Sequence, residues 1–343
     1  MLGKQFQSSA ISQCRVCWRL YQATPGQMQT RQFRVAVIGA VGGIGQPLSL
    51  LLMANKLVTE LVLHDLTATK GFGQDLSHID RACQVKSFFG EDQMESAIKG
   101  ADIVMITAGM PRKPGQTRDF LFDTNAPIVA KAAGLVSQHA AHALVGIITN
   151  PVNAVVAVAA EAMKKAGYYD PERLFGVTTL DVVRAEKFIG DHMSIHPGKV
   201  RIPVIGGHAG TTIVPIFSQC QPPFEGDEKC IASIVKRIQT GGDEVVKAKA
   251  GQGSATLSMA YAAARFTNAL MLGLKGEPGP PECAYVQSDA TEAPFFSTPL
   301  TLGPKGIEEN HGLPELDECE KEQLKVAVDA LKKSAAKGVK FME

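Results

Sequence analysis

Short runs of β-branched and apolar residues alternate with longer amphipathic segments through the first half of the chain. Strands are predicted at 34–38, 60–64, 85–89, 102–107 and 144–149, and helices at 48–53, 94–99 and 126–139. Strands separated by helices pair in parallel through right-handed crossovers. The pattern therefore predicts an α/β fold built on a doubly wound parallel sheet, with ligands bound beyond the carboxyl ends of its strands.

A glycine-rich turn follows the first predicted strand and opens the first predicted helix. It reads Gly39-Ala40-Val41-Gly42-Gly43-Ile44-Gly45. Such a turn brings free backbone N–H groups and the positive end of a helix dipole close to a pyrophosphate. The second predicted strand ends at Asp65, twenty positions beyond Gly45, where a carboxylate meets the adenosine ribose hydroxyls and repels a 2′-phosphate. Together, the glycine turn and Asp65 predict that the cofactor is NAD rather than NADP. The alternative for the glycines is a tight turn needed only for packing, and the alternative for Asp65 is a solvated residue that caps the next turn.

Polar residues follow two later strands. The segment 107–118 contains two glycines and two prolines, which predict a loop, and it carries Arg112 and Arg118. Guanidinium groups suit carboxylates, so the loop is a candidate for binding and enclosing an acidic substrate, and the alternative is a solvated basic loop. Asn150 follows the strand at 144–149, where its amide either hydrogen-bonds a ligand or forms a turn.

A histidine lies between glycines in the second half of the chain. The sequence 175–184, FGVTTLDVVR, opens a predicted helix that places Asp181 and Arg184 on one face, and a predicted strand at 199–205 leads into Gly206-Gly207-His208-Ala209-Gly210. Little local packing holds such a ring, so a carboxylate such as Asp181 is the natural group to orient it for chemistry. The alternative is a structural hydrogen bond between the two.

Composition, net charge and cysteine count argue against several classes of function. The chain has 343 residues, 45% hydrophobic and 20% charged, which is enough for two cores. A net charge of +1 does not favour nucleic acid or a membrane surface as a partner, and no apolar run is long enough to span a bilayer. Seven scattered cysteines argue against a disulfide framework and for a reducing compartment. The Cys14–Cys17 pair lacks a second pair at zinc-binding spacing, so no metal site is predicted.

The first thirty residues differ from the rest. No Asp or Glu occurs before Glu60, whereas basic residues are spread among Ser and Gln. Apolar residues at spacings of three and four can share one helical face beside two arginines: Ile11, Cys14, Trp18 and Tyr21. This is typical of a mitochondrial presequence, and the alternatives are a disordered extension or a plastid or peroxisomal address.

Several long motifs resemble those of the malate dehydrogenases, most of all the mitochondrial and bacterial enzymes of the lactate/malate dehydrogenase superfamily. They occur in the family's order from about Phe33 to near the C-terminus: GAVGGIG, MPRKPGQTR, IITNPVN, LFGVTTLDVVR, PVIGGHAG and AKAGQGSATLSMAYAAARF. The resemblance implies a Rossmann-type NAD-binding domain at 31–176, an α+β catalytic domain at 177–343 and a targeting presequence at 1–30. It also implies a homodimer in the mitochondrial matrix that exchanges malate and oxaloacetate using NAD.

The resemblance implies a role for each site residue. His208 accepts the proton during malate oxidation, and Asp181 orients its ring. Arg184 anchors the carboxylate next to the reacting carbon, while Arg112 and Arg118 are the loop arginines, with Arg112 on the distal carboxylate. Asn150 is shared by substrate and cofactor. Further cofactor contacts are implied at the whole glycine turn, Asp65, Asn125, Ile148, Thr149 and Met259.

Arg112 separates this chain from the related lactate dehydrogenases, which carry a neutral glutamine at the matching place. Phe120 and Asp123 depart from the residues common in the family, an acidic residue and an asparagine, so the rate of loop opening and cofactor affinity stay open. Two other hypotheses are a dehydrogenase for another 2-hydroxy acid, which Arg112 disfavours, and an NAD-binding protein without catalysis. The second is disfavoured because the base and the carboxylate anchors are all present.

Overall fold

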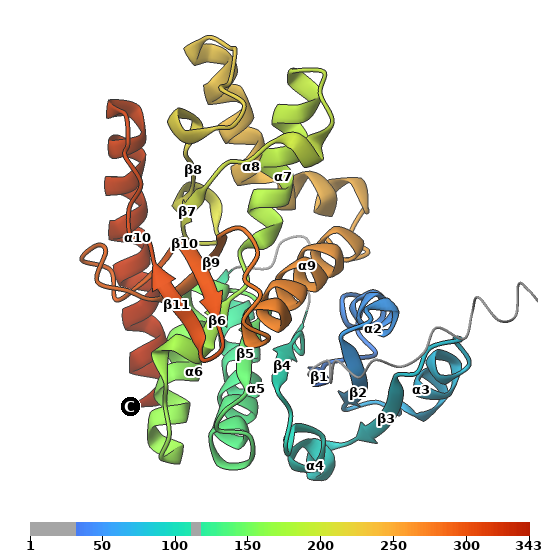
Figure 1. Cartoon of the computed structure of the whole chain (residues 1–343). Helices are drawn as coiled ribbons and strands as arrows, with labels where there is room; N and C mark the ends of the chain where they lie inside the picture. The colour runs from blue at the N-terminus through green and yellow to red at the C-terminus, as the bar shows by residue number, and fades with distance from the viewer. Residues whose placement is uncertain (1–31, 111–117) are drawn as a thin grey trace, which may run out of the picture. The chain divides into compact units, whose positions relative to one another are not determined.

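The computed structural model describes residues 32–110 and 118–343, and residues 32–343 form one compact unit (Figure 1). The strands are β1 (Phe33–Ile38), β2 (Val58–Asp65), β3 (Gln84–Phe89), β4 (Ile103–Ile106), β5 (Leu144–Ile147), β6 (Leu174–Gly176), β7 (Val204–Gly206), β8 (Ile213–Pro215), β9 (Glu282–Gln287), β10 (Phe295–Gly303) and β11 (Gly306–Asn310). The helices are α2 (Gly45–Ala54), α3 (Lys70–Ser77), α4 (Met94–Ile98), α5 (Arg118–His139), α6 (Val152–Ala166), α7 (Thr179–His192), α8 (Glu228–Ala248), α9 (Leu257–Leu274) and α10 (Glu318–Met342).

All of these strands join one sheet. Six of them run parallel in the order β3-β2-β1-β4-β5-β6, and the sheet continues through antiparallel pairing in the order β9-β10-β7-β8, with β11 beside β10. The predicted doubly wound parallel sheet, followed by an α+β part, is therefore confirmed. Gly176 at the end of β6 pairs with Tyr285 of β9, so the sheet is continuous between the two halves.

The parallel strands are buried on both faces. In β1, Val35 and Val37 belong to an apolar cluster that includes residues of α2 and α9, whereas Ala36 and Ile38 belong to a cluster that includes residues of α5, α6 and α10. Strands covered on both sides have continuous apolar sequences rather than alternating ones, which explains why these strands could be found from the sequence. Figure 1 shows the helices packed around this sheet.

Two predicted elements have different bounds in the structure. The strand predicted at 199–205 is wrong over most of its length, because only Val204–Gly206 forms β7. Residues Pro197–Lys199 form a 3-10 turn, and Pro203 has no N–H to donate to a neighbouring strand. The helix predicted from 126 begins at Arg118 and continues through Pro127, because residues before the proline, such as Phe122, are buried in the core.

Within the described part of the chain, no helix combines the length and the apolar character needed to cross a membrane.

Candidate active site

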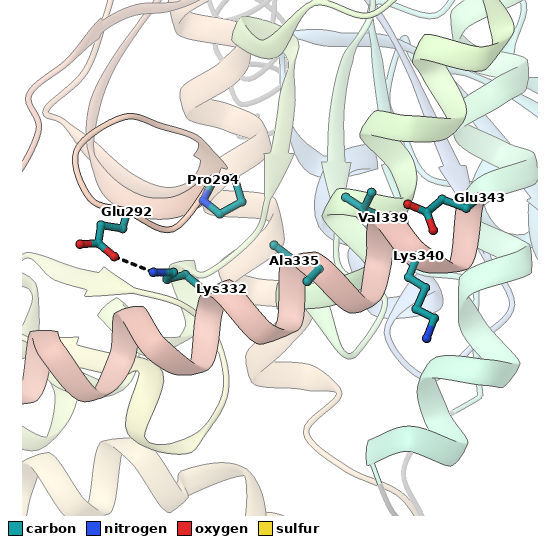
Figure 2. A pocket seen from close by; sticks show the side chains of 8 residues that line it. Glu292, Pro294, Lys332, Ala335, Val339, Lys340 and Glu343 are labelled. Atoms are coloured by element: carbon teal, nitrogen blue, oxygen red, sulfur yellow. Dashed lines mark hydrogen bonds and ion pairs between the residues drawn. The ribbon is translucent and has the colours of Figure 1, made fainter.

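A cavity of about 490 Å³ opens at the carboxyl ends of the parallel strands. It brings together many of the predicted site residues from both halves of the chain: Gly42, Gly43, Ile44, Asn125, Ile148, Thr149, Asn150, Asp181, Arg184, His208 and Met259. A second hollow, along the C-terminal part of α10, is lined by residues such as Glu292, Lys332 and Val339, and Lys332 is ion-paired with Glu292 at 2.5 Å (Figure 2). None of the residues predicted for chemistry lines that hollow, so the cavity at the strand ends is the candidate active site.

The glycines of the first turn make room for different neighbours. A Cβ on Gly39 would lie 2.5 Å from the backbone nitrogen of Ala108, and one on Gly45 would lie 2.0 Å from the carbonyl oxygen of Gly39. These two glycines therefore allow the chain to pack against itself. Gly43 instead lines the cavity, and no side chain caps the N-terminus of α2. The turn thus has the exposed backbone and the uncapped helix end that suit a pyrophosphate.

Asp65 lies at the end of β2, beside the glycine turn. Its Oδ2 accepts a hydrogen bond of 2.9 Å from the backbone N–H of Val41, and its Oδ1 accepts from the backbone N–H of Thr67 at 3.2 Å. The residues that line the cavity do not include Asp65, Gly39, Ala40, Val41 or Gly45. The structure therefore places Asp65 at the edge of the turn, where its carboxylate also holds the turn in place.

Two polar side chains of the cavity wall form hydrogen bonds mainly with backbone groups. The Asn125 side chain is buried, and its Oδ1 accepts from the N–H of Met110 at 2.7 Å while its Nδ2 donates to the carbonyl of Asn150 at 2.7 Å. The hydroxyl of Thr149 donates to the carbonyl of Ala108 at 2.7 Å. Both side chains therefore fix the strand ends around the cavity, whereas Asn150 itself is exposed at its wall.

His208 and Asp181 are brought into direct contact. The Nδ1 atom of His208 lies 2.5 Å from Oδ2 of Asp181, whose side chain is fully buried in the first turn of α7. An ionised carboxylate can only accept hydrogen bonds, so in the neutral ring the proton is on Nδ1. Nε2 is then an acceptor, and the His208 ring can take a proton from a ligand in the cavity.

Arg184 lies on the same face of α7 as Asp181, as its spacing predicts. Its Nη1 is 3.9 Å from Oδ1 of Asp181, and the side chain is 13% exposed. Burial lowers the pKa of Arg184 below its ordinary value, and the nearby carboxylates of Asp181 and Glu244 offset this only in part. An arginine side chain is nevertheless charged at neutral pH, because its ordinary pKa is so high. A Cβ on Gly241 of α8 would lie 3.1 Å from Nε of Arg184, so this helix passes close to the guanidinium.

The structure gives little information on the two loop arginines. Arg112 lies outside the described residues, and Arg118 is the first residue of α5, described only by its backbone.

Other cavity residues were not predicted from the sequence: Gln239, Asp243, Gln252, Gly253, Ser254 and Thr256. The last four belong to a glycine-containing stretch between α8 and α9, and that glycine pattern was the available signal. Gln239 and Asp243 lie within α8 and have no comparable signal.

The fold and the cavity define a protein of the Rossmann class, with a glycine turn at the end of the first strand and the His208–Asp181 contact in the same cavity. Residues 33–176 match the model of the lactate/malate dehydrogenase NAD binding domain, and residues 178–342 match that of the lactate/malate dehydrogenase alpha/beta C-terminal domain. The chain belongs to the lactate/malate dehydrogenase family.

Individual relatives agree with this assignment. The chain is 50% identical to the mitochondrial malate dehydrogenase of Bos taurus over 310 residues, which cover 90% of this chain and 92% of the relative. It is 49% identical to the mitochondrial malate dehydrogenase of Homo sapiens, with the same coverage. Among solved structures, it is similar to the malate dehydrogenase of Cryptosporidium parvum, with a TM-score of 0.77, 26% identity, and coverage of 90% of this chain and 99% of that one.

Proposed function

We propose that this protein is an NAD-dependent malate dehydrogenase, which interconverts (S)-malate and oxaloacetate. The observation that carries the proposal is the contact between Asp181 and His208 in a cavity that also contains the glycine turn and Arg184. Oxidation of a secondary alcohol requires a base for the hydroxyl proton and a nearby acceptor for the hydride. His208, in contact with Asp181, meets the first requirement. The glycine turn supports the second, because it suits the pyrophosphate of NAD, the hydride acceptor.

His208 is the proton acceptor in this proposal. Asp181 holds its Nδ1 proton, so Nε2 is available to accept the hydroxyl proton of malate and to return it in the reverse reaction. The buried Asp181 carboxylate also stabilises the imidazolium that forms. Arg184, next to this pair, binds the carboxylate adjacent to the reacting carbon, because a charged guanidinium donates two parallel hydrogen bonds to a carboxylate.

The cofactor fits the other end of the cavity. Gly43 presents backbone without a side chain, and a Cβ there would approach Cγ2 of Thr256 to 3.0 Å and narrow the cavity. The uncapped N-terminus of α2 stabilises a pyrophosphate, and Asp65 accepts from ribose hydroxyls. NAD, when bound, supplies the hydride acceptor and, when reduced, the donor. Ile148, Thr149, Asn150 and Met259 form the rest of this wall.

The loop arginines and the presequence complete the proposal by family resemblance. Arg112 binds the distal carboxylate and Arg118 assists it, while residues 1–30 direct the protein to the mitochondrial matrix. The curated relatives described as mitochondrial support this address. The matched family regions, 33–176 and 178–342, support an NAD-binding part at 31–176 and a catalytic part at 177–343.

The experiment that tests the function compares two substrates. Purified protein is mixed with NADH and either oxaloacetate or pyruvate, and nicotinamide absorbance is followed. We expect rapid oxidation with oxaloacetate and little with pyruvate. Arg112→Gln should weaken oxaloacetate reduction greatly and raise pyruvate reduction. In the wild type, pyruvate leaves the Arg112 guanidinium without a partner, and an enclosed charge without its partner costs about 3 to 5 kcal/mol. Equal rates with both substrates in the wild type, or unchanged discrimination in the variant, would contradict the proposal.

The homodimer is proposed on an apolar face formed by α2 and α9. These helices lie side by side, with Asn55 Nδ2 donating to Asn268 Oδ1 at 2.9 Å. The α2 sequence GQPLSLLLMA contains no charged residue, and the only one in α9, Arg265, is paired with Glu186 and Glu282. Large apolar side chains are nevertheless exposed on both helices: Leu50, Leu51, Leu257 and Tyr261. A pair of helices whose only charged residue is ion-paired, and which exposes large apolar side chains, fits a second copy of the same chain.

Sedimentation velocity tests this interface. The wild type should sediment as a dimer at micromolar concentration, and Leu50→Glu combined with Leu257→Glu should sediment as a monomer, because each buries an unpaired carboxylate in the interface. Val326→Glu on α10 is the matched control, since Val326 is also an exposed apolar residue of a helix. A monomeric wild type, or a dimeric double variant, would refute this interface.

A further inference from the structure

Asn153 is a buried amide that contacts the loop of His208. It lies in the first turn of α6 and is 4% exposed. Its Oδ1 accepts a hydrogen bond of 2.8 Å from the backbone N–H of His208, and its Nδ2 donates to the hydroxyl of Thr212 at 3.2 Å. One side chain therefore holds both ends of the turn that carries the histidine.

The Thr212 hydroxyl fixes which way this amide points. It donates to the carbonyl of Ala209 at 2.9 Å and accepts from the N–H of Ala209 at 3.0 Å, besides accepting from Asn153. A hydroxyl has one donor and two acceptor sites, so all three are used. Its proton cannot also be donated to residue 153. The side chain at 153 must therefore present a donor to Thr212 and an acceptor to His208, and an amide does both.

Close packing leaves this amide little freedom. A Cβ on Gly207 would lie 2.7 Å from Oδ1 of Asn153 and 2.6 Å from Cδ2 of Leu331. The glycine before His208 thus permits the Asn153 amide to lie directly against the backbone. On the other side, the buried hydroxyl of Tyr285 donates to the carbonyl of Asn153 at 3.3 Å, which ties this residue to β9.

The same segment reaches the cofactor side of the cavity. Asn150 lies three residues earlier at the cavity wall, and its carbonyl accepts from Asn125. The turn 150–153 therefore connects the end of β5 to the His208 loop, which follows β7. We propose that Asn153 is a positioning residue that fixes His208 relative to the cofactor side of the cavity, so that proton and hydride transfer occur in one geometry. This inference rests on the proposed function.

Asn153→Ala tests the inference in the full-length protein. A displaced base slows catalysis, so kcat/KM for oxaloacetate should fall on the order of 100-fold, as expected for a displacement of about 1 Å. The Kd of NADH, measured by fluorescence, should stay within about twofold. The solvent deuterium isotope effect on kcat should increase, because proton transfer becomes more rate-limiting. A residue that only supports folding would not produce this isotope effect.

Two further variants separate positioning from stability. Ser137→Ala is the matched control: it also removes a buried polar side chain, whose hydroxyl donates to the carbonyl of Tyr168 at 2.7 Å, and Ser137 does not line the cavity. It should lower Tm without changing kcat/KM. Thr212→Val should reduce kcat/KM less than Asn153→Ala, and the double variant should resemble Asn153→Ala, because the two side chains act as one unit.

The outcomes distinguish this inference from the proposed function. A wild type that does not reduce oxaloacetate refutes the proposed function. An active wild type with Asn153→Ala within about twofold of its kcat/KM refutes the positioning role. Equal loss of NADH affinity and activity in Asn153→Ala, or additive effects with Thr212→Val, would also refute it, because the residue would then support the fold in general.

Discussion

Two glycine-containing turns follow buried strands and line the same cavity, yet they are built in different ways. The turn after β1, residues 39–45, has no side chain capable of acid–base chemistry. It is held by the carbonyl of His64, which accepts from Gly39 N–H at 2.8 Å, and by the side chains of Asp65 and Thr107. The turn after β7, residues 206–210, presents His208, which is held by Asp181 of α7 and Asn153 of α6. A turn that binds a ligand through its backbone thus needs small residues next to one another in the chain. A turn that carries a catalytic side chain needs partner side chains from distant segments to orient it.

The comparison predicts that changes in the two turns separate catalysis from cofactor binding. Substitutions at the second turn should lower kcat with NADH affinity preserved, and those at the first turn should do the reverse. Three substitutions test that separation and a fourth tests the choice of cofactor; they follow in order of expected effect.

His208→Gln should have the largest effect. A glutamine side chain cannot accept the proton at neutral pH, so kcat for malate oxidation should fall roughly 10² to 10⁴-fold, the usual contribution of a general base. The Kd of NADH should be unchanged, because the glycine turn is untouched. Stopped-flow absorbance and fluorescence titration measure the two quantities. A variant with more than a tenth of wild-type kcat would show that His208 is not the base.

Asp181→Asn should have the next largest effect, with kcat reduced on the order of 100-fold, at the lower end of the range for loss of general-base catalysis. The amide nitrogen of the new asparagine can donate to Nδ1, which would move the ring proton to Nε2 and remove the acceptor from the cavity. A steady-state assay in both directions measures the loss. Combining this change with His208→Gln should add little to the effect of His208→Gln, and an additive result would mean that the two residues act separately.

Gly43→Val tests the first turn. Its side chain would meet Cγ2 of Thr256 and enter the cavity, so the Kd of NADH should rise roughly tenfold, equivalent to about 1.4 kcal/mol. At saturating NADH, kcat should stay close to the wild-type value. Gly71→Val is the control, because apart from its own helix backbone and chain neighbours nothing lies within 4 Å of its Cβ position. If Gly43→Val lowered kcat as strongly as it weakened binding, the two turns would not be separable.

Asp65→Ser should have the smallest effect. Removal of the carboxylate lessens the repulsion of a 2′-phosphate but also removes the acceptor for the N–H of Val41. The ratio of kcat/KM with NADPH to that with NADH should rise about five- to tenfold, which corresponds to an electrostatic change on the order of 1 kcal/mol near the surface. Steady-state assays with each cofactor give the ratio. An unchanged ratio would remove Asp65 from the choice of cofactor.

The parts of the fold that were predictable share a physical cause. Strands such as β1 and β2 are buried on both faces, so their apolar residues are consecutive in the sequence and are easily recognised. Some antiparallel strands of the second half are short: β7 and β8 have three residues each. They pair with each other, and β7 also pairs with β10, which is far away in the chain. A three-residue strand has too few positions to show a period, which explains why the strand predicted at 199–205 was misplaced.

The sequence by itself determined the glycine turn, the strand that ends at Asp65, and the spacing that puts Asp181 and Arg184 on one helix face, because each depends on residues close together in the chain. The tertiary structure decided that His208 meets Asp181 and that Asn153 holds the histidine loop. Asn153 is 55 residues from His208, and its role depends on the separation and orientation of α6 and the loop after β7. Hydrogen bonds require distances and angles that spacing along the chain does not specify, so only packing of the complete sheet and its helices could fix them.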